Sequence, residues 1–323
     1  MRTLACYAFS LCAFATFLAA CSRLQPPVGV MQSVSQNRSS MGRTGSWMLP
    51  QAKSEDLLYV SDQLSNDIYV FTYPGGRPAG TLTGFSLPEG LCSDGKGDVF
   101  VTDLLARDIV EYAHGGTSPI RTLKEDGNPE GCSVDPTTGN LAVANYQYSS
   151  GSGNIAVFKN AQGTPVVYSD PALNIVWNCG YDDTGNLFAD GQNAANQPRL
   201  AELPNGAATL KNLTLERSFD AQGSVQWDGR HIVIMGDRPP NRIYRLAISG
   251  SQATIVGSTT LSDASIYEQV FWIHAGTLTL TYIPKRARYP AIGFWRYPGG
   301  GEPTRTMRDL PGVYGVTISV AAK

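Results

Sequence analysis

The sequence is poor in charged residues and in histidine, and both shortages narrow the range of functions. Only 16% of the 323 residues are charged, the formal net charge is −2, and there are three histidines. A nucleic-acid-binding protein carries a clustered basic excess, which this chain lacks, so we expect no nucleic-acid partner. The scarcity of histidine argues against a metal site built from several imidazoles.

Motifs of several common enzyme classes are also missing from the chain. There is no phosphate-binding P-loop, no G-x-S-x-G nucleophile elbow, no H-E-x-x-H zinc motif and no C-x-x-C pair. His114, His231 and His274 do not have the spacing of metal ligands. Composition and motifs therefore identify no enzyme class by themselves.

Long apolar runs are scarce, and one of them carries information. Leu4–Ala20 contains no charge and spans 17 residues, which is short for a membrane helix, and it ends in small residues. The tetrapeptide Leu18-Ala19-Ala20-Cys21 resembles the lipobox of bacterial lipoproteins. That resemblance implies cleavage before Cys21 and acylation of Cys21 with palmitate-type chains. The alternative is an ordinary secretory signal peptide followed by a chance cysteine.

The lipoprotein resemblance also implies a location. Two or three acyl chains hold a soluble domain on a membrane, whereas one chain alone binds marginally. Ser22 follows the cysteine, where Gram-negative lipoproteins kept at the inner membrane usually have Asp, so we expect outer-membrane anchoring in the cell envelope. We predict a signal peptide over 1–20, a lipidated Cys21 with a flexible Ser-, Gln-, Pro- and Gly-rich tether over 21–55, and one folded domain over 56–323.

What the chain has in abundance is glycine, proline and aromatic residues, which favour an all-β protein with many turns. A strand–turn–strand unit recurs six times, with equivalent apolar positions at 68, 109, 155, 200, 243 and 292. A second unit lies between these copies and reads PEGLCSDGKGDVFVTD at 88–103, PEGCSVDPTTGNLAVAN at 129–145 and WNCGYDDTGNLFAD at 177–190. Degenerate copies follow at 223–237 and 268–282.

Together the two units give four short antiparallel strands every 41–49 residues, which is the period of a β-propeller blade. The chain starts with a strand typical of the second position in a blade, at 57–62, and ends with a first-position strand at 313–320. We therefore predict an all-β, six-bladed propeller whose C-terminal strand completes the N-terminal blade and closes the ring. The alternative is a β-sandwich or solenoid with loose repeats.

The second unit resembles the NHL repeat. Its pattern PxG-x-x-x-D-x-x-G-N-x-Y/F-V-x-D is matched from Pro88, from Pro129 and around Asn178–Asp190, and more weakly in the other blades. In that family the ring more often binds or scaffolds than catalyses. A more distantly similar group, the senescence-marker/gluconolactonase-like hydrolases, holds a divalent cation at the mouth of the central channel.

Aligning the first strands of the blades predicts one ring of side chains at a channel mouth. The ring consists of Glu89, Glu130, Trp177, Gly223, Glu268 and Tyr314, with Asn178 beside it. Carboxylate and amide oxygens suit a hard cation such as Ca²⁺, so Glu89, Glu130, Asn178 and Glu268 are candidate ligands. If no ion binds, crowding of like charges is expected to raise carboxyl pKa values. Alternatively, these carboxylates accept hydrogen bonds from neighbouring backbones.

Aromatic and acidic residues near the ring have similar alternatives. Trp177, Tyr267 and Tyr314 suit stacking on a sugar or another flat ligand, or ordinary packing. Acidic and amide residues end the second strands and form the inner turns at regular intervals, and we expect them to be structural. They are Asp62, Asp103, Asn145, Asp190 and Asp237 at the strand ends, and Asp94, Asp135 and Asp182 in the turns.

Cleavage of the signal peptide and lipidation of Cys21 leave three cysteines, Cys92, Cys132 and Cys179, in an oxidising compartment. Three thiols form at most one intramolecular disulfide. Cys132 and Cys179 occupy equivalent positions on adjacent inner strands. Two alternatives follow for this pair: a disulfide between them, or inert packing as small side chains. Cys92 lies one position out of step with both.

These observations predict a lipid-anchored envelope propeller that acts as a scaffold for a protein or a small ligand at the Glu89/Glu130 face. The alternative is a divalent-metal-dependent, lactonase-like hydrolase with its site at the channel mouth. A third interpretation is a docking platform within an envelope complex. The sequence favours binding over catalysis and does not identify the ligand.

Overall fold

The computed structural model describes residues 45–146, 151–219, 223–236, 241–265 and 270–322. The chain divides into two compact units, residues 1–39 and 40–323, and the account below concerns the second. Several predictions fall on residues outside the described ranges: the signal peptide, Cys21, the tether as far as residue 44, Asp237, Tyr267 and Glu268.

The described chain is almost entirely β-structure, as the composition predicts. Its two short 3₁₀ segments are η1 (Pro50–Ser54) and η2 (Lys159–Ala161). Neither segment, nor any other helix within the described ranges, has the length and apolar character needed to cross a bilayer.

The strands follow the predicted repeats. The first set is β1 (Trp47–Met48), β2 (Leu57–Asp62), β3 (Asp67–Thr72), β4 (Pro78–Leu82) and β26 (Val313–Ser319). The second is β5 (Pro88–Ser93), β6 (Val99–Asp103), β7 (Asp108–Tyr112) and β8 (Pro119–Lys124). The third is β9 (Pro129–Val134), β10 (Leu141–Asn145), β11 (Asn154–Phe158) and β12 (Val166–Ser169).

The remaining sets continue the pattern. The fourth is β13 (Ile175–Tyr181), β14 (Leu187–Gln192), β15 (Pro198–Leu203) and β16 (Lys211–Leu215). The fifth is β17 (Val225–Trp227), β18 (Ile232–Met235), β19 (Arg242–Ser249) and β20 (Gln252–Thr260). The sixth is β21 (Ala264–Ser265), β22 (Phe271–His274), β23 (Thr277–Pro284), β24 (Ala291–Arg296) and β25 (Arg305–Met307).

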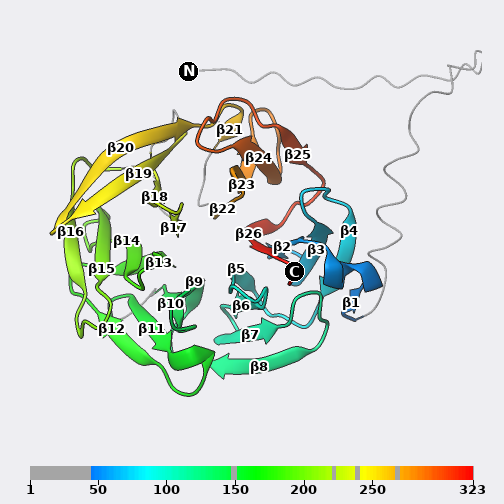
Figure 1. Ribbon diagram of the computed structural model, residues 1–323, viewed down its shortest axis with the longest axis horizontal. Coiled ribbons are helices and arrows are strands. Elements are labelled where there is room, and N and C mark those ends of the chain that lie inside the picture. Colours follow the sequence, from blue (N-terminus) through cyan, green and yellow to red (C-terminus); the bar gives the residue numbers. More distant parts are fainter. Residues whose placement is uncertain (1–44, 147–150, 220–222, 237–240, 266–269, 323) are drawn as a thin grey trace, which may run out of the picture. The chain divides into compact units, whose positions relative to one another are not determined.

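The sheets are arranged around a common axis in the manner of a β-propeller (Figure 1). The first strand of each set, β26, β5, β9, β13, β17 or β22, lies innermost. β26 pairs antiparallel with β2, from Val316 opposite Val60 to Ser319 opposite Leu57. The C-terminal strand therefore completes the N-terminal sheet as its innermost strand, as predicted, and joins the two ends of the ring.

The prediction of six separate four-stranded sheets needs correction. Hydrogen bonding defines five sheets, because β16 and β20 pair in parallel at Thr214–Gln252 and Leu215–Ala253 and merge two sets into one eight-stranded sheet. The outer strands meet there edge to edge, which the hydrophobic period of either strand does not predict. Two further sheets have a fifth strand, β1 on β4 and β21 on β23.

The hydrophobic core is divided among the interfaces between neighbouring strand sets. Each of six clusters of buried side chains combines residues from two sets adjacent around the ring. One contains Leu57 and Tyr59 with Leu91 and Val101, and the last joins Leu58 to Ile292 across the ring closure. Apolar side chains that alternate to both faces of each sheet therefore pack against two neighbours.

The N-terminal side of the folded domain differs from the prediction of a flexible tether that continues to residue 55. Trp47 and Met48 pair with Thr81 and Gly80 on the outer edge of the first sheet, and η1 follows directly. Ala52 is buried in the core cluster between the first two sets. The packed chain therefore begins several residues before residue 56 and covers an otherwise open strand edge.

Of the two alternatives stated for Cys132 and Cys179, a disulfide between them is wrong. Cys132 is bonded to Cys92, and Cys179 is a buried free thiol. Equivalent positions point the same way relative to their own sheets: the sulfur of Cys132 lies 3.9 Å from the Phe100 carbonyl oxygen, and that of Cys179 lies 3.7 Å from the Ala142 carbonyl oxygen. Because side chains alternate along a strand, the out-of-step Cys92 faces the other way and meets Cys132.

Candidate functional site

Four inner strands have an irregular register near the same end of the ring, and the predicted site residues lie at these points. Glu130 and Trp177 are the extra residues in the pairings of β9 with β10 and of β13 with β14. The register also shifts at Glu89 and Gly90 in β5, and at Tyr314 and Gly315 in β26. A bulge breaks the alternation of side chains and redirects one of them. The repeats predicted these positions, but the bulges were not apparent from the sequence.

The redirected side chains surround one cavity of about 430 Å³, which we name the carboxylate pocket. Its polar and aromatic lining consists of Gln63, Glu89, Glu130, Tyr146, Trp177 and Tyr314. The structure thus brings together four predicted ring residues from four different strand sets. The sequence analysis missed Gln63 and Tyr146, which directly follow the second strands, one position after Asp62 and Asn145.

Both carboxylates of the pocket are buried and accept hydrogen bonds from neighbouring blades. Glu89 is 4% exposed, and its Oε2 accepts a hydrogen bond of 2.6 Å from Gln63 Nε2. Glu130 is 7% exposed, and its Oε1 accepts a hydrogen bond from the Tyr314 hydroxyl. These contacts hold the side chains across the ring from one strand set to another. The structural alternative stated for the acidic ring named backbone donors, whereas the donors here are the side chains of Gln63 and Tyr314.

The opposite wall of the pocket is aromatic and has an unmet hydrogen-bond donor. The rings of Tyr146 and Trp177 lie 4.7 Å apart between centroids and are tilted by 39°. The Trp177 indole Nε1 is buried and has no acceptor within the described parts of the chain. A buried donor without an acceptor costs free energy, so this side chain is held in place by its packing and not by a hydrogen bond at Nε1.

Asn178 does not join the carboxylate pocket. Its Oδ1 accepts the Cys179 amide at 2.7 Å and its Nδ2 donates to the Gly223 carbonyl at 3.2 Å, so both ends of the side chain are engaged by backbone. The residue lines the cavity on the other side of the ring instead. Within the described ranges, no group of three or more His, Cys, Asp or Glu side chains is arranged to hold a metal ion.

Acidic residues at the ends of the second strands tie the loops to the inner strands, as predicted. Asp103 accepts the amides of Ser86 and Leu87 at 2.7 and 2.8 Å. Asp190 accepts the amides of Asn178 and Gly223 at 3.0 and 2.8 Å. Burial raises the pKa of Asp190 to about 6, although these two amide hydrogen bonds favour the ionised form.

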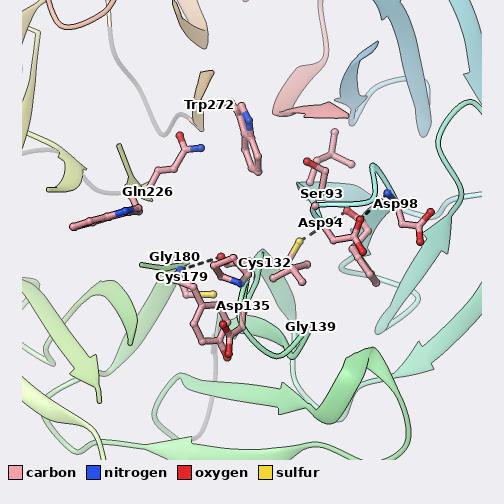
Figure 2. Close-up of a pocket in the computed structure, with 18 of the residues that line it drawn as sticks. Ser93, Asp94, Asp98, Cys132, Asp135, Gly139, Cys179, Gly180, Gln226 and Trp272 are labelled. Carbon is pink, nitrogen blue, oxygen red and sulfur yellow. Dashed lines mark hydrogen bonds between the residues drawn. The ribbon is translucent and has the colours of Figure 1, made fainter. Parts of the chain in front are cut away.

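A larger cavity of about 980 Å³, which we name the Trp272 cavity, contains the other ends of the inner strands. Figure 2 shows Trp272 and Gln226 on one side of it and Ser93, Asp94 and Asp98 on the other. Its wall is acidic, with Asp94, Asp98, Glu111, Asp135, Asp182 and Asp183 against Lys96 and Arg121. Burial raises the pKa of Glu111, which pairs with Arg121 at 2.5 Å.

Several of these acidic side chains form hydrogen bonds within their own turns. Asp94 accepts the amides of Lys96 and Asp98 at 2.9 and 2.8 Å. Asp135 and Asp182 accept amides from their own turns in the same way. The predicted structural role of the three turn carboxylates is therefore confirmed, and the Trp272 cavity contains no second convergence of redirected side chains like that of the carboxylate pocket.

Comparison with solved structures gives a likeness of fold. A structure of a nidogen/laminin complex matches with 15% identity and a TM-score of 0.63, covering 83% of this chain and 100% of the other. A Bacteroides caccae protein of unknown function matches with 11% identity and a TM-score of 0.58, covering 82% and 99%. Kuenenia stuttgartiensis hydrazine synthase matches with 12% identity and a TM-score of 0.57, covering 83% and 80%. No protein-family model and no curated protein matches the sequence.

Proposed function

We propose that this chain is a lipid-anchored, six-bladed propeller of the cell envelope that binds a protein partner at the carboxylate pocket. The observation that carries the proposal is the convergence of Glu89, Glu130, Trp177 and Tyr314 on one cavity from four separate inner strands. Each lies at a register irregularity that redirects its side chain. Structural packing alone does not need four such irregularities at the same end of a ring.

The binding role also has support from the likeness of fold. One similar solved structure is that of a nidogen/laminin complex, a propeller-like chain in a complex of two proteins. Rigid rings present a rim whose loops vary without disturbing the core, and this suits recognition. The six-bladed, NHL-like interpretation is supported by six core clusters around the ring and by the PEG repeats at Pro88 and Pro129.

The contacts of three proposed metal ligands weigh against the lactonase-like alternative, and the fourth, Glu268, lies outside the described residues. The proposed ligand Asn178 turns its oxygen to the Cys179 amide, and Glu89 and Glu130 accept hydrogen bonds from Gln63 and Tyr314. A cation at the pocket would compete with each of these contacts. We therefore propose recognition rather than hydrolysis as the activity of the pocket.

Site-specific photo-crosslinking in the cells that produce the chain tests the binding role. A benzophenone amino acid at Leu87, which lines the carboxylate pocket, is expected to give an adduct with a discrete higher mass. The matched control places the same amino acid at Val320, which lines the Trp272 cavity. We expect loss of the Leu87 adduct when Trp177→Ala is added. Equal adducts at both positions, or an adduct indifferent to Trp177→Ala, would contradict the proposal.

The anchor is tested separately at Cys21. Cys21→Ala removes the thiol that a lipobox cysteine contributes to the thioether-linked lipid, so we expect the mature chain to leave the membrane fraction after an alkaline wash. A variant with Ser22→Asp keeps the cysteine and is expected to stay with membranes but to change from outer to inner membrane. Persistence of the Cys21→Ala chain in washed membranes would refute lipid anchoring.

A further inference from the structure

Three loops beside the carboxylate pocket carry exposed apolar side chains. Leu64 in the β2–β3 loop is 72% exposed, Leu105 in the β6–β7 loop is 65% exposed, and Tyr289 in the β23–β24 loop is 54% exposed. Leu64, Leu104 and Pro290, one from each loop, line the carboxylate pocket, so all three loops lie on the same face of the ring. We name loops 63–66, 104–107 and 285–290 the basic rim.

The apolar tips of the basic rim have matching positions. Four residues separate Asp62 from Asp67 in the first loop and Asp103 from Asp108 in the second, and the leucine is the second of the four in both. Loops of the same length in neighbouring sets project to a similar height above the ring. Leu64 and Leu105 therefore lie at matching points of two neighbouring loops on this face of the ring.

Charge on the basic rim has one sign. The three loops carry four exposed cations and no carboxylate; the cations are Arg107, Lys285, Arg286 and Arg288. No described residue forms an ion pair with any of the four, and the Arg288 guanidinium lies 5.5 Å from the centroid of the Tyr289 ring. Asp62 and Asp103, which directly precede two of these loops, accept the backbone amides of Ser65 and Leu87.

Two of these arginines occupy left-handed backbone positions. Arg107 has φ 53° and Arg286 has φ 68°, and Asn66 has φ 58° at the position equivalent to Arg107. Asparagine tolerates this conformation well, and a long side chain tolerates it less well. The local fold therefore does not account for arginine at position 107, and such residues are often retained at functional sites.

We propose that the basic rim docks on an anionic lipid surface. Leu64, Leu105 and Tyr289 enter the interfacial layer, while the four cations contact lipid phosphates. A bilayer accepts separate apolar tips, whereas a protein partner needs a continuous complementary surface, which separate loop tips do not form. This contact does not require an acyl group at Cys21. Where Cys21 is acylated, the contact strengthens membrane binding, because a single lipid signal anchors weakly.

Docking through the basic rim is compatible with a binding role for the pocket. The three loops join β2 to β3, β6 to β7 and β23 to β24, which occupy one side of the ring, while β13 and β14 lie on the other side (Figure 1). A membrane that contacts the first side of the ring leaves the part of the pocket lined by Tyr146 and Trp177 accessible from the second side. The rim thus sets the orientation of the ring on a membrane.

Vesicle flotation of residues 40–323 tests the proposal without any lipid anchor. This fragment contains the ring closure and all six core clusters, so it holds every contact that builds the ring. We expect it to float with vesicles of equimolar phosphatidylcholine and phosphatidylglycerol and not with phosphatidylcholine alone. Arg107→Glu is expected to lower the partition coefficient at least about fivefold, the factor that corresponds to about 1 kcal/mol per cation near an anionic surface.

Matched variants separate docking from loss of folding. Leu64→Asp with Leu105→Asp is expected to lower vesicle binding, whereas Ile120→Asp, an exposed apolar site on β8, and Lys96→Glu in the β5–β6 turn are expected to leave it unchanged. All variants should keep the wild-type melting temperature. A fluorophore at Leu64→Cys should shift to the blue on vesicles, and one at Ile120→Cys should not. Equal partition onto both vesicle types, or equal losses in rim and control variants, would overturn the proposal.

Discussion

At the scale of single residues, the orientation of a side chain is decided by whether its strand is regular or bulged. Cys92 and Cys132 meet because regular alternation turns them in opposite directions within neighbouring sheets. Glu130 and Trp177 reach the carboxylate pocket because each is an extra residue that interrupts that alternation. The repeat pattern therefore predicted where these residues lie more reliably than where their side chains point.

The disulfide is predicted to join Cys92 to Cys132 in the oxidised protein. Non-reducing peptide mapping should find those two peptides linked, and the Cys179 thiol should react with a maleimide only after unfolding, because it is buried and burial raises its pKa. Replacing both bonded cysteines with serine should cost about 2–4 kcal/mol, because the bond closes a loop across a sequence separation of 40. A peptide containing Cys179 linked to Cys132 would refute this pairing.

Asp190 is predicted to make folding stability fall as pH rises. Its pKa is about 6 in the folded protein, above the usual 3.8, so the folded state holds the proton more tightly than the unfolded state. The stabilisation that the Asp190 carboxyl contributes is fully present below about pH 4. It is lost as the pH rises through about 6, which lowers the free energy of unfolding by about 1–3 kcal/mol.

Asp190→Asn tests the sign of this effect. Asn is neutral but accepts only one of the two amides, so the variant should be less stable than wild type near pH 4.5 and the gap should narrow near pH 7. Denaturant unfolding at both pH values measures the gap. Asp183→Asn, at an exposed site, is the control and should show no such change. A gap that widens toward neutral pH would contradict the assignment.

At the scale of elements, close approach of neighbouring inner strands explains the glycine in the PEG repeat. A Cβ at Gly90 would overlap the carbonyl oxygen of Glu130, and one at Gly315 would overlap that of Glu89. A Cβ at Gly131 would lie 2.7 Å from Cγ of the Asn178 side chain. Glycine at this position lets one inner strand pack directly against the next around the ring.

Gly90→Ala is predicted to destabilise the ring. The added methyl must displace backbone rather than a flexible side chain, so we expect a loss of about 1–3 kcal/mol in the free energy of unfolding. Gly95→Ala is the matched control, because nothing lies within 4 Å of its added Cβ and its φ is ordinary, so the variant should be neutral or slightly stabilising. Denaturant titration of both variants measures the difference. Similar free energies of unfolding for the Gly90→Ala and Gly95→Ala variants would contradict this prediction, because they would mean that the inner strands move apart at little cost.

The sequence predicted most strands because period-two alternation and Asp/Gly turns are local signals. It did not predict β1 on β4, or the parallel contact of β16 with β20. Both are contacts between outer edges, and they depend on how closely two edges approach in space. Gln63 and Tyr146 were missed at the pocket for a related reason, because they reach it from loops outside the repeat motif.

At the scale of the whole molecule, the two ends of the ring differ in chemistry. One end combines the carboxylate pocket with a rim of exposed cations and apolar tips. The other end contains the Trp272 cavity, where acidic turns outnumber the cations Lys96 and Arg121. A ring with unlike ends takes a preferred orientation at a charged surface, which suits a protein that presents one face to a membrane and its pocket to a partner.

The central claim is that the carboxylate pocket recognises a partner through hydrogen bonds and aromatic rings and does not act through a bound cation. Its most direct test is the metal content of residues 40–323 by mass spectrometry, with a thermal-shift titration of Ca²⁺ and Mn²⁺. Because Glu89, Glu130 and Asn178 are already engaged by the protein, we predict far less than one ion per chain and no shift at millimolar cation. A near-stoichiometric ion that is lost in Glu89→Gln would contradict the claim and favour the hydrolase.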